Sequence, residues 1–185
     1  MINTDQTNKI DKKYILISAL AVFLSWVLHE FAHWAAGRYL GFDMGMSLNK
    51  TFPVKGQFDS DWQYQAVSAA GPVFTILEAF VFFLLLKQKK RKYFYPFLFT
   101  CFYMRFFAAA ISVLNPNDEA RISKSIGLGT FMLPVLVTVF LFFLIYKISE
   151  QYRFNLKFNI KTLGLTILFS SIIILTDQYF HIRLL

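Results

Sequence analysis

Two histidines and a glutamate form a compact group near the end of the first apolar segment. His29 and His33 are four residues apart, so on a helix both imidazoles lie on one face, about one turn apart. Imidazoles in that arrangement can ligate one metal ion, and Glu30 directly follows the first of them. Zinc lowers the pKa of a water molecule that it binds, and a neighbouring carboxylate can take the released proton. The segment therefore predicts two metal ligands, His29 and His33, and one general base, Glu30.

The alternative interpretation is that these are ordinary polar residues at a helix end. The chain has only three histidines, and two of them stand in this segment. Glu30 also lies within an apolar stretch, where an unpaired carboxylate costs several kcal/mol in a bilayer. Both facts favour a metal site.

A third protein ligand is expected, because catalytic zinc sites use three ligands and leave one position open. Asp118 is the candidate, since it follows the third apolar segment and returns to the membrane face of the histidines. Glu119 is a rival ligand and His181 a weaker one. The Asn-Pro-Asn-Asp sequence at 115–118 also favours a plain turn, so that interpretation stays open.

The composition indicates a membrane protein. Of 185 residues, 56% are hydrophobic and 16% charged, whereas soluble domains average about a quarter charged. The net charge of +8 could suggest a nucleic-acid partner. However, the lysines and arginines cluster between apolar runs, where they set membrane topology and meet anionic headgroups. The expected partner is thus the lipid bilayer, and no nucleic acid is expected.

Five apolar runs are long enough to cross a bilayer, which needs about 20 residues each. We expect an all-α bundle of about five transmembrane helices, forming a single membrane domain over residues 1–185. The predicted spans are 14–36, 66–86, 93–114, 128–148 and 163–179.

The basic residues of the connections predict the orientation, since cytoplasmic loops carry an excess of them. Twelve lie in the N-terminal segment and in the second and fourth connections, against six on the opposite side. We therefore expect an integral protein of the cell membrane (plasma or inner) with a cytoplasmic N-terminus. A cleaved signal peptide is the alternative for the first span, but cleavage would discard the histidine pair.

Two further features concern the interior and the one long polar connection. Glu78 and Arg105 each lie about midway along adjacent spans, and neither should face lipid unpaired. We predict a structural ion pair between them, with pairing to water or backbone carbonyls as the alternative. In the connection 41–65, residues 44–52 could form a strand whose edge accepts a peptide, or a plain surface loop.

These motifs together resemble the site-2 protease family of intramembrane zinc metalloproteases. The shared features are the His-Glu-x-x-His helix, Ala70-Gly71-Pro72 in the second apolar segment, and the Asn-Pro…Asp element that contains Asp118. The resemblance implies a metalloprotease-like core of three helices over 14–121, with two additional membrane helices over 128–180. It also implies one Zn²⁺ per chain and hydrolysis of peptide bonds in membrane-embedded or membrane-adjacent protein substrates.

The sequence departs from the family pattern at two positions. Thr75 stands where the family has an asparagine after Ala-Gly-Pro, and Glu119 follows Asp118 where the family has glycine. By resemblance, Gly71, Pro72 and Thr75 would bind substrate; the alternatives are a helix start for Gly71-Pro72 and a bond within its own helix for Thr75. The departures keep a second function open, a non-proteolytic or inactive zinc-binding membrane protein acting as a helix-binding or assembly factor. Familiar members also carry zinc nearer the cytoplasmic face, whereas the charge count places this site nearer the external face.

Overall fold

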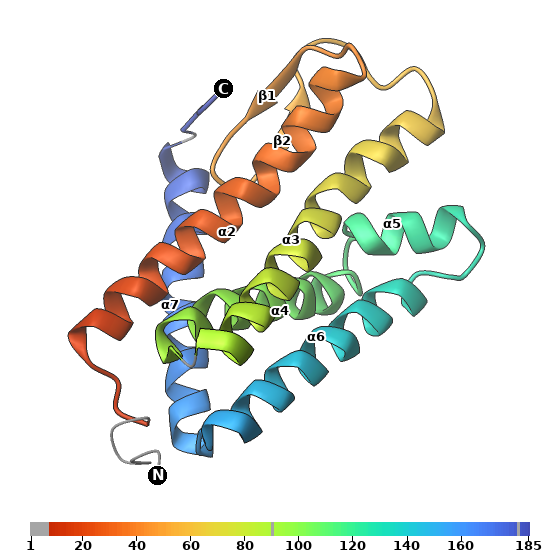
Figure 1. The fold of residues 1–185 in the computed structure, drawn as a ribbon. Helices are drawn as coiled ribbons and strands as arrows, with labels where there is room; N and C mark the ends of the chain where they lie inside the picture. The colour runs from red at the N-terminus through yellow and green to blue at the C-terminus, as the bar shows by residue number, and fades with distance from the viewer. Residues whose placement is uncertain (1–7, 90, 181) are drawn as a thin grey trace.

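Helices account for 74% of the described residues, and the only sheet among these residues is one short hairpin (Figure 1). A computed structural model describes residues 8–89, 91–180 and 182–185. This architecture confirms the predicted all-α bundle. The helices are α2 (Lys12–Tyr39), α3 (Asp61–Lys89), α4 (Tyr95–Ile111) with the preceding 3-10 turn η1 (Lys92–Phe94), α5 (Asp118–Ser125), α6 (Met132–Tyr152) and α7 (Leu156–Phe180).

Five helical segments are long and apolar enough to cross a membrane: α2, α3, η1 with α4, α6 and α7. Their exposed faces carry large apolar side chains, as expected for surfaces that meet lipid. The first turn of α2 and the C-terminal residues lie at opposite ends of the bundle, as an odd number of spans requires (Figure 1). The chain is therefore a membrane protein, while the side on which its N-terminus lies stays a prediction.

Of the helix boundaries, the starts of α7 and α3 differ most from the predicted spans. α7 begins at Leu156 rather than at 163, because the long stems of Lys157 and Lys161 can follow an apolar helix while their charged ends reach water. α3 begins at Asp61 rather than at 66, so it extends beyond its apolar stretch. As a result Pro72 lies inside α3, and the predicted helix start at Gly71-Pro72 is wrong.

The connection between α2 and α3 contains an antiparallel hairpin of β1 (Met44–Met46) and β2 (Thr51–Pro53). Gly45 stands opposite Phe52, and the phenyl ring fills the space that a side chain at Gly45 would need. Asp177 of α7 holds the turn, since its carboxylate accepts hydrogen bonds from Ser47 Oγ at 2.9 Å and from the Leu48 amide at 3.1 Å. The hairpin is thus fastened to the last membrane helix.

The second edge of β1 is also paired. The amide of Met46 donates to the carbonyl of Leu185 at 3.1 Å, and the amide of Leu184 donates to the carbonyl of Met46 at 2.8 Å. The C-terminal residues therefore occupy the outer edge of β1. Strand β2 packs against α2, where the Thr51 hydroxyl contacts Glu30.

Polar side chains connect the apolar helices to one another. The hydroxyls of Tyr14 on α2 and Thr162 on α7 lie 2.9 Å apart, and Trp26 Nε1 donates to Ser170 Oγ at 3.3 Å between the same helices. Hydrogen bonds of this kind hold membrane helices in register, because lipid offers no alternative partner.

The turn after α4 determines where α5 begins. The side-chain Nδ2 of Asn117 donates to the carbonyl of Ala108 at 3.0 Å, and the backbone amide of Asn117 donates to Ser112 Oγ at 3.1 Å. These bonds tie residue 117 back to the last turns of α4. α5 then packs against α3 and α6, and its first residue, Asp118, points into the bundle.

Candidate metal centre

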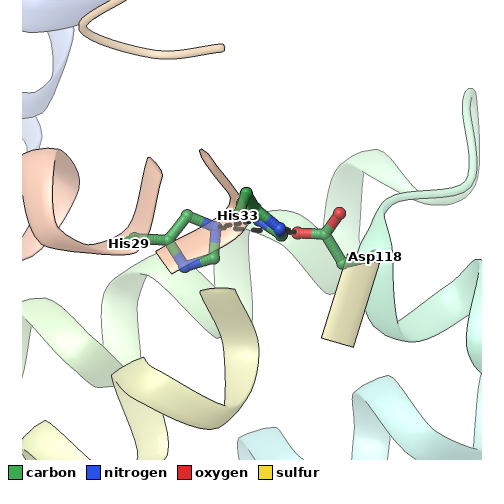
Figure 2. Close-up of side chains that lie close together, drawn as sticks. All are labelled: His29, His33 and Asp118. Atoms are coloured by element: carbon green, nitrogen blue, oxygen red, sulfur yellow. Dashed lines mark hydrogen bonds and ion pairs between the residues drawn. The ribbon is translucent and has the colours of Figure 1, made fainter. Parts of the chain in front are cut away.

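Three potential metal ligands from α2 and α5 converge on one point (Figure 2). The Nε2 atoms of His29 and His33 are 3.2 Å apart, and Asp118 Oδ2 lies 3.6 Å and 3.4 Å from them, respectively. Tetrahedral zinc with bonds of about 2.0–2.1 Å has ligand atoms about 3.3 Å from one another. The three separations are close to this length, so the residues present fit a small divalent ion.

Both histidines are oriented through their Nδ1 atoms. His33 Nδ1 lies 2.7 Å from the carbonyl of Val67, which can only accept, so the proton is on Nδ1. Thr75 Oγ1 donates its single proton to the carbonyl of Gly71 and lies 3.0 Å from His29 Nδ1, so it accepts a hydrogen bond from that nitrogen. Each neutral imidazole then presents its Nε2 lone pair to the shared point, which is the tautomer that a metal requires.

Arg121 fixes the orientation of the third ligand. Its Nη2 donates to Asp118 Oδ1 at 2.6 Å, which leaves Oδ2 for the histidines. Asp118 is thus ready to act as a carboxylate ligand. Sequence reasoning treated Arg121 only as a topological charge, although its spacing of three residues from Asp118 on a helix was a usable signal.

Gly71 lies directly against the two imidazoles. A side-chain carbon at this position would overlap with His33 Nε2 and lie 2.7 Å from His29 Nδ1, closer than real contacts allow. Gly71 therefore lets α3 approach the histidine pair. The histidines occupy the space beside Gly71, and the prediction that it binds substrate stays a prediction.

Pro72 and Thr75 are buried with Gly71 in the α2–α3 interface, and neither lines the pocket. The Thr75 side chain has no exposed surface and its hydroxyl already bonds His29 and its own helix. The structure thus gives Thr75 the role of orienting a ligand, in place of the predicted contact with substrate.

Glu30 lies at the wall of the pocket and is 7% exposed. Thr51 Oγ1 lies 3.0 Å from both Glu30 Oε2 and the Glu30 carbonyl, so strand β2 supports the carboxylate. Sequence reasoning did not find Thr51, because only the folded hairpin brings it next to α2.

The predicted ion pair between Glu78 and Arg105 is not formed. Arg105 Nη1 donates to Glu119 Oε1 at 2.9 Å, and both side chains are nearly fully buried. Glu78 instead accepts a hydrogen bond from Ser25 Oγ at 2.7 Å. The reason for this difference is α5, a short helix that the sequence did not predict and that brings a nearer carboxylate to Arg105.

The ion pair between Arg105 and Glu119 also distinguishes the two candidates for the third ligand, Asp118 and Glu119. Glu119 is engaged with Arg105, whereas Asp118 faces both histidines. His181 lies outside the described residues. The geometry therefore selects Asp118 as the third ligand of the cluster.

The ligands lie at the base of a pocket of about 680 Å³. Its walls come from six parts of the fold: α2, the hairpin, α3, α4, the start of α5 and the end of α7. Representative lining residues are Lys50, Phe52, Met104, Arg105, Ile174 and Gln178.

Comparison of the chain with protein-family models, with curated proteins and with solved structures gives no match. The site consists of a cluster of two histidines and one aspartate, with a glutamate and a pocket beside the cluster. Such a cluster can hold a divalent ion and leave a coordination position open.

Proposed function

We propose that this chain is a zinc-dependent membrane metallopeptidase similar to the site-2 proteases, and that it hydrolyses peptide bonds of membrane-embedded or membrane-adjacent proteins. One observation carries the proposal: three oriented ligand atoms are spaced as a tetrahedral ion requires, inside a bundle of membrane helices. Glu30 in the wall of the adjoining pocket adds the second component of a hydrolase.

Zinc is the favoured metal because of the three donor residues and the glutamate beside them, Glu30. Two histidines and one carboxylate are a ligand set of hydrolytic zinc sites, and the glutamate next to the first histidine supplies their general base. The same donors also serve non-haem iron(II), so the test below measures both metals. When bound, zinc supplies a Lewis acid that polarises a carbonyl and activates water at neutral pH.

Glu30 has the role of moving the proton. Its carboxylate takes a proton from the attacking water while the water oxygen bonds to the carbonyl carbon of the substrate. When the carbon–nitrogen bond breaks, the protonated Glu30 returns the proton to the departing amine. Thr51 holds the carboxylate through one oxygen, which restricts its motion between the two transfers.

The fold supports an extended peptide as the substrate. A helical substrate hides its carbonyls in hydrogen bonds and must unwind before water can attack. All three residues of β2 line the pocket, and the edge of a strand can hold an unwound segment by backbone hydrogen bonds. The corresponding edge of β1 is already paired with the C-terminal residues.

Metal content is the first test. We expect detergent-purified protein to hold close to one zinc per chain, and His33→Ala and Asp118→Ala to lose it. Asp43→Asn is the matched control, since it alters an exposed carboxylate paired only with Arg38. Iron in place of zinc, or no metal in folded protein, would refute the zinc hydrolase.

Activity is the second test, with Glu30→Gln as the decisive variant. We expect the zinc-loaded parent to cleave quenched-fluorescence peptides and single-span peptides in vesicles. Glu30→Gln should keep its zinc and lose activity by about 10²–10⁴-fold, the usual contribution of a general base. A parent that holds zinc and cleaves neither substrate would favour the helix-binding or assembly function.

A further inference from the structure

Arg105 is a buried charge beside the metal ligands that the proposed chemistry has not yet used. It lies in α4, is 4% exposed, and lines the pocket together with His29 and Asp118. A cation inside a membrane bundle is costly and marks a functional site unless its pairing accounts for it.

Its pairing accounts for only part of the guanidinium. Nη1 donates to Glu119, whereas the buried Nε has no partner among the described residues. Nη2 lies 3.5 Å from His29 Nε2, the atom whose lone pair faces the metal position. With a metal in place that lone pair is used, so Nη2 also lacks an acceptor. Buried donors without acceptors are unfavourable, and an acceptor entering the pocket would satisfy them.

The charges around the cluster indicate that this acceptor is an anion. At their formal charges, the three carboxylates and two guanidinium groups leave one negative charge before a metal binds. A divalent ion turns this into one net positive charge. An oxygen that carries negative charge would then neutralise the site. The three carboxylates are Glu30, Asp118 and Glu119, and the guanidinium groups are those of Arg105 and Arg121.

We propose that Arg105 is a catalytic residue that stabilises the negative charge developing on the scissile carbonyl oxygen, an inference that rests on the proposed function. When the water oxygen bonds to the carbonyl carbon, the carbon–oxygen double bond becomes a single bond and its oxygen gains negative charge. Arg105 donates to that oxygen and holds it until the carbon–nitrogen bond breaks and the double bond re-forms. Preorganised donors of this kind act strongly because they are already oriented in a site that excludes water.

Glu119 has a distinct part in this arrangement. It anchors one end of the guanidinium through Nη1 and leaves the other end directed at the ligands. Arginine suits this dual contact because its donors form a rigid, planar fork. A lysine at this position would have a single ammonium group, which would have to bind Glu119 and also donate to the substrate oxygen.

The test measures anion binding to metal-loaded protein, independently of hydrolysis. Cobalt(II) is loaded in place of zinc, and sodium acetate is titrated at constant ionic strength while visible absorption is recorded. The variants are Arg105→Gln combined with Glu119→Gln, which removes both buried charges together, and Arg105→Lys, which keeps a cation for Glu119. Arg38→Gln is the matched control, because it removes a half-exposed arginine at the end of α2.

We expect the double variant and Arg105→Lys to hold one cobalt and to bind acetate at least about 10-fold more weakly than the parent, as expected for loss of a charged hydrogen bond. Arg38→Gln should match the parent. With a cleavable peptide, both Arg105 variants should also lose about 10²–10³-fold in kcat at unchanged zinc content.

Three other outcomes bear on the proposal. Acetate affinity equal to that of the parent, in a variant that retains cobalt, would overturn the role of Arg105 and leave the proposed function intact. If the double variant loses cobalt, Arg105→Lys decides the question by the same comparison. A folded parent that binds no cobalt would overturn the proposed function and this inference with it.

Discussion

At the scale of single residues, the two imidazoles depend on neighbours that bind no metal themselves. Thr75 accepts the Nδ1 proton of His29, and the carbonyl of Val67 accepts that of His33. Such partners fix the tautomer and the ring orientation, and their loss typically costs 10–100-fold in metal affinity.

Thr75→Val tests this arrangement with little change of shape. Valine lacks the hydroxyl, so His29 loses its acceptor, and we expect zinc affinity to fall by about 10–100-fold. Thr75→Ser should retain most of the affinity because the acceptor remains. Competition with a chelator of known affinity provides the measurement, and equal affinities for the valine variant and the parent would contradict the role of Thr75.

Gly71→Ala tests the close contact between α3 and the histidines. The added methyl group overlaps both imidazoles, so we expect loss of the metal and a lower unfolding temperature. Gly164→Ala is the matched control in α7, where an added carbon would meet no atom within 4 Å. The control should retain the metal. Full metal content in Gly71→Ala would contradict this, since it would mean that α2 and α3 can move apart without loss of the metal.

The sequence was informative about the ligands but not about their supports. The spacing of His29 and His33 follows from helix geometry, and Asp118 follows from the order of the spans. Arg105 was correctly expected to have a carboxylate partner, but its partner is Glu119 instead of Glu78. That choice depends on side-chain positions in space, which periodicity does not encode.

At the scale of elements, the five long helices were predictable because each must present about 20 apolar residues to lipid. The helix α5 was not, since its eight residues are mostly polar and the sequence that leads into it also favours a turn. The hairpin likewise depends on remote partners, namely Asp177 on α7 and the C-terminal residues. Both unpredicted elements approach the site from parts of the chain far from the histidines.

Asp177→Ala should loosen the hairpin without removing the metal. The change removes the acceptor of the Leu48 amide and of Ser47 Oγ, each a charge-assisted hydrogen bond. We expect the Leu48 amide to exchange its hydrogen about 10–100-fold faster, as measured by hydrogen–deuterium exchange. Asp177→Asn, which retains one acceptor oxygen, should have a smaller effect. Unchanged exchange in the alanine variant would mean that the C-terminal residues alone hold β1.

At the scale of the whole molecule, one end of the bundle is strongly basic. The connection between α3 and α4, the connection between α6 and α7, and the N-terminal segment share this end. The hairpin and the metal cluster lie toward the other end. The distribution of basic residues therefore predicts that the metal faces the outside of the cell.

Cysteine labelling of intact cells tests this orientation. Lys55→Cys lies in the hairpin connection and Lys89→Cys at the basic end, and both side chains are exposed. A membrane-impermeant thiol reagent should label position 55 and not position 89. The reverse pattern would place the metal nearer the cytoplasm, where the site-2 proteases carry theirs.

The contact between Gly71 and the histidines also constrains how this sequence can change over generations. Most apolar residues that face lipid can be exchanged for other apolar residues. Position 71 has no such freedom, since every other amino acid adds a carbon where the imidazoles lie. A descendant that retains His29, Glu30 and His33 but carries alanine at position 71 would preserve the appearance of the motif without its metal. Loss of the glycine would therefore mark a chain in which α3 can no longer pack against the histidine pair.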